Sequence, residues 1–133
     1  MGFDGVLVVD AVGFPRGIWL LWDSSIVHIV EAGRSSQFLL VRGKIGATEW
    51  YFTTVYGSPT LVQHGALWDS LRDIATNMSN PWLLCGDFNS LLHASEKFGA
   101  VDFDASCVRE FQDCLLDTRL IDLQFTGPLF TWF

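Results

Sequence analysis

Apolar residues follow two different periods along the chain, and the period changes at Pro59. Before this residue, short apolar or alternating runs are separated by Gly, Pro and Ser, a pattern typical of strands joined by brief turns. After it, apolar residues recur at i, i+4, i+7 and i+11 from Leu67 to Met78, which is typical of an amphipathic helix that ends before Pro81. The chain is therefore expected to adopt an α+β fold, with mostly antiparallel strands and flanking helices.

The boundaries of the expected elements come from the same pattern. Strands are predicted over residues 5–9, 17–22, 26–30, 37–45, 49–55, 82–86, 120–123 and 130–133. Helices are predicted over 61–78 and 106–117, turns over 13–16 and 33–36, and a loop over 90–105. The apolar run 82–86 is expected to be a buried, central strand.

The length and composition are typical of one domain, here residues 1–133. Charged residues make up 17% of the chain, against about 25% in typical soluble domains. No apolar run approaches the roughly 18–20 residues of a membrane span, and no signal peptide is recognisable. We therefore expect an intracellular protein, nuclear or cytoplasmic, with no membrane partner.

The net charge of −7 argues against a strong electrostatic grip on nucleic acid, whose usual footprint is a basic patch. It does not exclude a metal-dependent nuclease, because divalent ions bridge carboxylates and phosphate. The three cysteines show no spacing typical of a disulfide framework or a zinc site. Cys85 is expected to be a small core residue, and Cys107 and Cys114, seven apart, are expected on the inward face of a helix.

The most informative segment starts at Trp82 and reads Trp-Leu-Leu-Cys-Gly-Asp-Phe-Asn. Side chains at i and i+2 of an extended chain point the same way, so Asp87 and Asn89 can act on one substrate atom while Phe88 points into the core. A carboxylate can hold a metal or orient a water, and an amide can donate to a phosphate oxygen. The alternative is a strand followed by an Asx turn, in which Asp and Asn serve the local backbone.

Three further segments accompany this one in a fixed order. Residues 16–22 read Arg-Gly-Ile-Trp-Leu-Leu-Trp, residues 56–59 read Tyr-Gly-Ser-Pro, and residues 127–132 read Gly-Pro-Leu-Phe-Thr-Trp. The ordered set resembles the endonuclease/exonuclease/phosphatase superfamily, which includes deoxyribonuclease I. It is most similar to the endonuclease domains of plant non-LTR (LINE-type) retroelements, over nearly the whole chain. The resemblance implies a deoxyribonuclease I-like α/β sandwich, here incomplete.

The resemblance also implies a reaction, the Mg²⁺-dependent hydrolysis of DNA phosphodiester bonds by an activated water. In such a site Asp87 would bind the metal and orient or deprotonate the water, and Asn89 would help to fix the nucleophile. Tyr56 would stabilise charge on the scissile phosphate. The alternative for Tyr56 is a strand-end aromatic with its ring in the core. Trp132 would pack beneath the site.

Complete domains of this superfamily also carry a metal-binding Glu early and a Ser-Asp-His motif late. The chain contains no Asp-His pair, and none of His28, His64 and His93 matches the catalytic histidine. We therefore expect a truncated middle portion of the domain, with hydrolysis near background and weak or absent DNA binding. Two alternatives stay open. One is a phosphoesterase for small molecules that uses His93 or His64 as its base, and the other is a non-catalytic module that self-associates through exposed strand edges.

Overall fold

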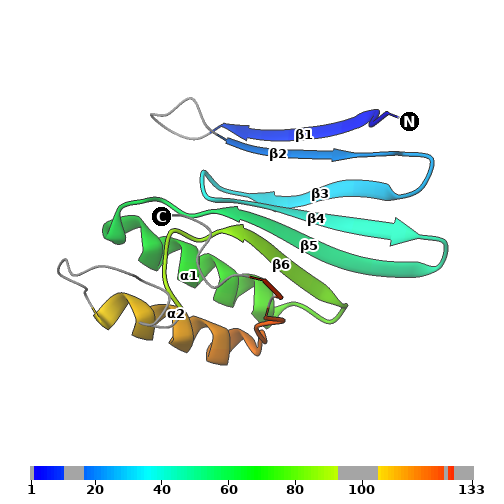
Figure 1. Ribbon diagram of the computed structural model, residues 1–133. Helices are drawn as coiled ribbons and strands as arrows, with labels where there is room; N and C mark the ends of the chain where they lie inside the picture. The colour runs from blue at the N-terminus through cyan, green and yellow to red at the C-terminus, as the bar shows by residue number, and fades with distance from the viewer. Residues whose placement is uncertain (1, 11–16, 93–104, 125, 128–133) are drawn as a thin grey trace. The chain divides into compact units, whose positions relative to one another are not determined.

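The computed structural model describes residues 2–10, 17–92, 105–124 and 126–127. Contacts divide the chain into two compact units, which are described here one at a time. The first comprises residues 1–59 and 78–89 and contains the six strands of the described chain, and the second comprises residues 60–77 and 90–133 and contains the two helices (Figure 1). Mostly antiparallel strands with separate helices confirm the α+β class. The expectation of one domain over residues 1–133 stays a prediction.

The first unit begins with a two-stranded antiparallel sheet of β1 (Gly5–Asp10) and β2 (Gly17–Trp22). Both strands are almost continuous apolar runs, so both faces of this sheet carry apolar side chains. One face contributes Val9 and Ile18 to the core, where each side chain is buried. The predicted strands 5–9 and 17–22 are confirmed to within one residue.

The second sheet of this unit has four strands in the order β3-β4-β5-β6 (Figure 1). Its strands are β3 (His28–Arg34), β4 (Phe38–Ile45), β5 (Thr48–Tyr56) and β6 (Trp82–Asp87). The first three pair antiparallel, whereas β5 and β6 are parallel. A parallel pair needs a long crossover connection, and residues 57–81 provide it. Among the described strands β6 lies at the edge of the sheet, whereas a central strand was predicted.

The core of the first unit lies between the two sheets. Leu39 and Val41 of β4 are almost fully buried and form one cluster with Val9 and Ile18. A polar contact also joins the sheets, because the Arg34 guanidinium donates to the backbone carbonyl of Val8 at 3.0 Å. Because successive side chains of a strand point to opposite faces, Leu39 and Val41 share the face of the larger sheet that packs against the smaller one.

Strand boundaries near β3 differ from the prediction. Residues 26 and 27 belong to a turn, in which both backbone N–H groups donate to the carbonyl of Asp23. β3 therefore begins at His28 rather than at residue 26, and it continues to Arg34, which takes the first two residues of the predicted turn 33–36 into the strand. A register shift between Glu31 and Gly33 accommodates this extension as an irregularity of the β3–β4 pair.

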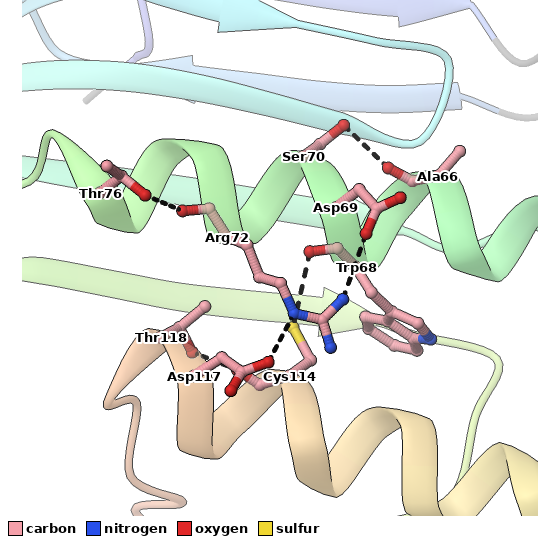
Figure 2. Close-up of polar contacts among 9 residues, drawn as sticks. All are labelled: Ala66, Trp68, Asp69, Ser70, Arg72, Thr76, Cys114, Asp117 and Thr118. Atoms are coloured by element: carbon pink, nitrogen blue, oxygen red, sulfur yellow. Dashed lines mark hydrogen bonds and ion pairs between the residues drawn. The ribbon is translucent and has the colours of Figure 1, made fainter.

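The second unit consists of α1 (Leu61–Thr76) and α2 (Ala105–Thr118), close to the predicted 61–78 and 106–117. Trp68 of α1 stacks on Phe111 of α2 with ring centroids 4.7 Å apart. Figure 2 shows Arg72 between two carboxylates, with its Nε 2.8 Å from Asp117 and its Nη1 3.2 Å from Asp69. Aromatic stacking and an interhelical ion pair therefore hold the two helices together.

Cysteine positions only partly follow the prediction. Cys114 is fully buried, and its Sγ lies 3.8 Å from the backbone carbonyl of Trp68 (Figure 2). Burial raises the pKa of the Cys114 thiol to about 11, since the thiolate would lose its hydration. Cys107 is half-buried, and Cys85 is exposed on β6 rather than in the core. The cause is the edge position of β6, which a run of apolar letters cannot reveal.

The predicted strand 120–123 is also wrong. α2 ends with Arg119 in the left-handed region (φ 58°), while the N–H of Leu120 donates to the carbonyl of Leu115. This is a Schellman-type helix end, and it turns the chain away from an extended path. Gln124 also has a positive φ of 60°, so positive-φ residues bound the segment on both sides.

Some predicted features lie outside the described residues, namely the turn 13–16, the strand 130–133, most of the loop 90–105, His93 and Trp132. In the part of the chain that is described, neither helix has the length and apolar character needed to span a membrane.

Candidate functional site

The candidate site lies at the carboxyl ends of β5 and β6, which are neighbours in the larger sheet (Figure 1). Their parallel register pairs Tyr56 with Asp87, the last residue of each strand. Two of the three predicted site residues are therefore brought together by the register. The carboxyl ends of parallel strands are also where open α/β sheets usually bind ligands.

A tight backbone junction joins the two strand ends. The N–H of Gly57 donates to the carbonyl of Asp87 at 2.7 Å. A Cβ atom on Gly57 would lie 2.2 Å from the carbonyl oxygen of Phe88, so only glycine allows this approach. The same holds on β6, where a Cβ atom on Gly86 would lie 2.0 Å from the carbonyl oxygen of Val55.

Asn89 belongs to the junction through its backbone and its side chain. Its φ is 48°, and its N–H donates to Oδ1 of Asp87 at 2.9 Å. Its Nδ2 donates to the carbonyl of Gly57 at 2.7 Å. The chain is therefore not extended at Asn89, and the expectation that its side chain parallels that of Asp87 was wrong. The structure contains the Asx turn, because Asn tolerates the left-handed region and pairs with nearby backbone.

Asp87 is exposed and keeps an open carboxylate. One oxygen accepts from the N–H of Asn89, which fixes the orientation of the carboxylate. Carboxylate oxygens suit Mg²⁺, which commonly binds through one or two carboxylates and keeps several waters. Among the described residues, no group of three or more His, Cys, Asp or Glu side chains is close enough to hold a metal. Asp87 is therefore not part of a described group of three or more such side chains.

Tyr56 is half-buried, and its side chain packs against the core cluster of the first unit. This contact agrees with the alternative in which the ring belongs to the core. Its backbone N–H donates to the carbonyl of Gln37 at 2.8 Å. The position of Tyr56 beside Asp87 is thus fixed by the packing of its ring and by its backbone hydrogen bond, and does not depend on a contact of the phenol hydroxyl.

Gln37 is a residue of the site that the sequence did not reveal. Its side chain is 8% exposed, and its Oε1 accepts from the backbone N–H of Ser58 at 2.8 Å. Together with its carbonyl, it holds the segment Tyr56–Ser58 in place. A single Gln before an apolar strand carries no signal for this role, whereas Gly57 was visible as part of Tyr-Gly-Ser-Pro.

Of the two histidines considered as substitute bases, His93 lies outside the described residues, so only His64 can be placed, and His28 is described as well. His64 is 2% exposed on α1 and packs at 5.9 Å against the ring of Trp68, which is typical of a core histidine. His28 is exposed at the start of β3, at the opposite end of the sheet from Tyr56 by the register of β4 and β5.

Comparison with known proteins gives no further assignment. No protein-family model matches the sequence, and no curated protein matches it significantly. The resemblance to the endonuclease/exonuclease/phosphatase superfamily therefore stays a prediction that rests on the ordered motifs.

Proposed function

We propose that this chain carries part of a Mg²⁺-dependent phosphodiesterase site of the endonuclease/exonuclease/phosphatase type, on an incomplete deoxyribonuclease I-like fold. The ancestral substrate is DNA, and the ancestral reaction is hydrolysis of a phosphodiester bond by water. We expect these 133 residues alone to hydrolyse DNA at a rate near background.

The observation that carries the proposal is the junction of β5 and β6. It gathers Tyr56, Asp87 and Asn89, which the motifs selected independently of any structure, at one edge of the sheet. Gly57 and Gly86 permit this close approach, because a Cβ atom at either position would overlap the backbone of the neighbouring strand end. This arrangement holds the carboxylate of Asp87 in a fixed orientation and leaves it exposed.

Each residue contributes differently. Asp87 would hold the hydrated Mg²⁺, which supplies a polarised water and charge stabilisation when it is bound. Asn89 acts as a positioning residue, because its side-chain N–H and backbone N–H are both used within the junction. Tyr56 lies beside Asp87, and its hydroxyl would contact a phosphate oxygen while its ring packs against the core cluster.

The low activity follows from the missing general base and second carboxylate. A positioned acid or base typically contributes about 10²–10⁴-fold. The sequence has no Asp-His pair, and among the described residues no group of three or more His, Cys, Asp or Glu side chains could hold a metal. One carboxylate with one hydrated cation leaves the attacking water without a proton acceptor.

The test is nicking of supercoiled plasmid by the purified chain with Mg²⁺, beside the Asp87→Ala variant. The expected result is equal, background nicking by both proteins. Nicking that disappears in Asp87→Ala would show a working site and contradict the assignment as an inactive portion. Because background nicking alone is also expected of an unrelated protein, the assay is paired with the metal-binding measurement that closes the Discussion.

A second candidate, a non-catalytic interaction module, is favoured by one observation. The face of the β1–β2 sheet that points away from the core is apolar and exposed, with Val6 53%, Trp19 68% and Leu21 47% accessible. Exposed apolar faces of this kind mark association sites. This candidate predicts concentration-dependent self-association in sedimentation that Asp87→Ala does not change. Sedimentation as a monomer at all concentrations would remove it.

A further inference from the structure

A cavity of about 540 Å³ that is open to the surface lies in the first unit, and neither the resemblance nor the proposed function uses it. It lies between β2 and the larger sheet, near the starts of β5 and β6 and thus at the other end of these strands from Asp87. Its walls include Leu20, Trp22, Ile29, Trp50, Phe52 and Leu83. The core cluster of Val9, Ile18, Leu39 and Val41 fills one part of the space between the two sheets, and the cavity lies next to it, with Val41 in its wall.

Two tryptophans form its walls because glycines make room for them. Trp22 pairs across the small sheet with Gly5, where a Cβ atom would lie 2.1 Å from the indole ring. Trp50 pairs with Gly43 of β4, where a Cβ atom would lie 2.4 Å from the ring. Each indole therefore lies across its neighbouring strand. Strand alternation places Trp22 on the side of Ile18, which faces the core.

The chemistry of the walls defines the ligand. The lining residues from the described chain are aliphatic or aromatic apart from the tyrosine hydroxyl and indole N–H groups, and none is charged. A volume of this size lies within the range of about 300–1,000 Å³ that is usual for small-molecule sites. Aromatic walls favour flat rings through offset or edge-to-face stacking. A charged ligand would lose its hydration without gaining a partner.

We propose that this cavity binds a neutral, flat aromatic molecule of small-ligand size, between the faces that carry Trp22 and Trp50. Leu83 lies at its rim, because this side chain lines the cavity and is still 48% exposed. The inference is independent of the proposed phosphodiesterase site, since it depends on different residues at the opposite end of β5 and β6.

The test uses N-phenyl-1-naphthylamine, a neutral aromatic probe whose fluorescence rises in apolar surroundings. Titration of the purified chain should give saturable binding of one probe per chain, with energy transfer from tryptophan. Leu83→Glu places a charge at the rim and should weaken binding at least tenfold. The matched control is Val6→Glu, a similarly exposed apolar strand residue (53%) that does not line the cavity, and it should change the affinity less than twofold.

A filling variant keeps the test decisive if Leu83→Glu fails to fold. Ile29→Phe adds volume inside the cavity and should weaken the probe while leaving the thermal midpoint equal or higher. Equal losses in Leu83→Glu and Val6→Glu, or unsaturable uptake of many probes, would show nonspecific adsorption and overturn the inference. If probe binding disappears as the chain dimerises, the cavity is covered by a second copy of the chain, and this result would also overturn the inference.

Discussion

Two turns in this molecule share their local geometry and differ in their surroundings. In one, the N–H of Asn89 donates to Oδ1 of Asp87 at 2.9 Å, and in the other the N–H of Gln124 donates to Oδ1 of Asp122 at 2.8 Å. Asn89 and Gln124 both have positive φ, of 48° and 60°. Both aspartates are exposed, so neither turn is distinguished by burial.

The surroundings separate them. The Asp87 turn is joined to the end of a parallel neighbouring strand by two hydrogen bonds to Gly57, at 2.7 Å each, while the Asp122 turn follows the end of α2 in irregular chain. An Asp that accepts from the N–H of a positive-φ residue two positions later therefore forms this turn in either setting. The candidate site differs from the second turn because the end of β5, at Gly57, is fixed beside the carboxylate of Asp87. The variants below remove this contact or measure its contribution.

The largest effect is expected from Gly57→Ala, which removes the support of the first turn. The added Cβ atom would overlap the carbonyl of Phe88, and such overpacking typically costs about 1–3 kcal/mol. The free energy of unfolding should fall by that amount in chemical denaturation. Gly33→Ala is the matched control, because its Cβ would meet Leu40 at an ordinary 3.8 Å. Equal losses in both variants would mean that the junction is not tightly closed.

A smaller effect is expected from Asn89→Ala. It removes the hydrogen bond to Gly57 and places alanine in the left-handed region, so the loss should be about 1–2 kcal/mol. Gln124→Ala keeps the backbone hydrogen bond of the second turn and replaces a residue with no special tolerance of positive φ. It should change stability by less than about 0.5 kcal/mol. Equal losses in the free energy of unfolding for Asn89→Ala and Gln124→Ala would contradict the distinction between the two turns.

Thiol chemistry gives an independent view of the two regions. Cys85 is exposed two residues before Asp87, whereas Cys114 is buried in the unit that contains Asp122. Although partial burial raises the pKa of the Cys85 thiol, an aromatic disulfide reagent at pH 8 should modify it rapidly and leave Cys114 unmodified until the chain unfolds. Rapid modification of Cys114 in the native chain would contradict the packing of α1 on α2.

The last comparison concerns the pH dependence of stability. The pKa of Cys114 is raised from 9.0 to about 11 in the folded chain. The unfolded thiol thus releases its proton first as the pH rises. This contribution to stability is complete below pH 9 and declines between about pH 9 and 11. Cys114→Ala should show a flatter decline over this window in denaturation curves, with Cys107→Ala as the control that retains the slope.

Much of the fold could be predicted from local pattern, and the failures have physical causes. The α1 helix and the strands β1, β2 and β5 follow from apolar period and from Gly and Pro punctuation. The edge position of β6 could not be predicted, because pairing depends on distant residues and an apolar run looks the same at the centre and at the edge of a sheet. The strand expected at 120–123 failed because the helix end at Arg119 overrides a short apolar run.

The candidate site was predictable to the same extent. Asp87, Asn89 and Tyr56 could be selected from motifs, and the Asx turn was one of two stated alternatives. The contribution of Gln37 could not be selected, since its hydrogen bonds go to the backbone of residues 56 and 58, about twenty positions away. Long-range contacts between side chain and backbone leave no trace in spacing.

The central claim is that Asp87 binds a hydrated divalent cation. The most direct test is Mn²⁺ binding followed by water-proton relaxation, with Asp87→Asn beside Asp122→Asn. Both variants keep an oxygen that can accept the turn hydrogen bond, so each removes charge and preserves the local fold. The account predicts weak binding of one ion that is lost in Asp87→Asn and unchanged in Asp122→Asn. Binding that survives Asp87→Asn, or that falls equally in both variants, would contradict it.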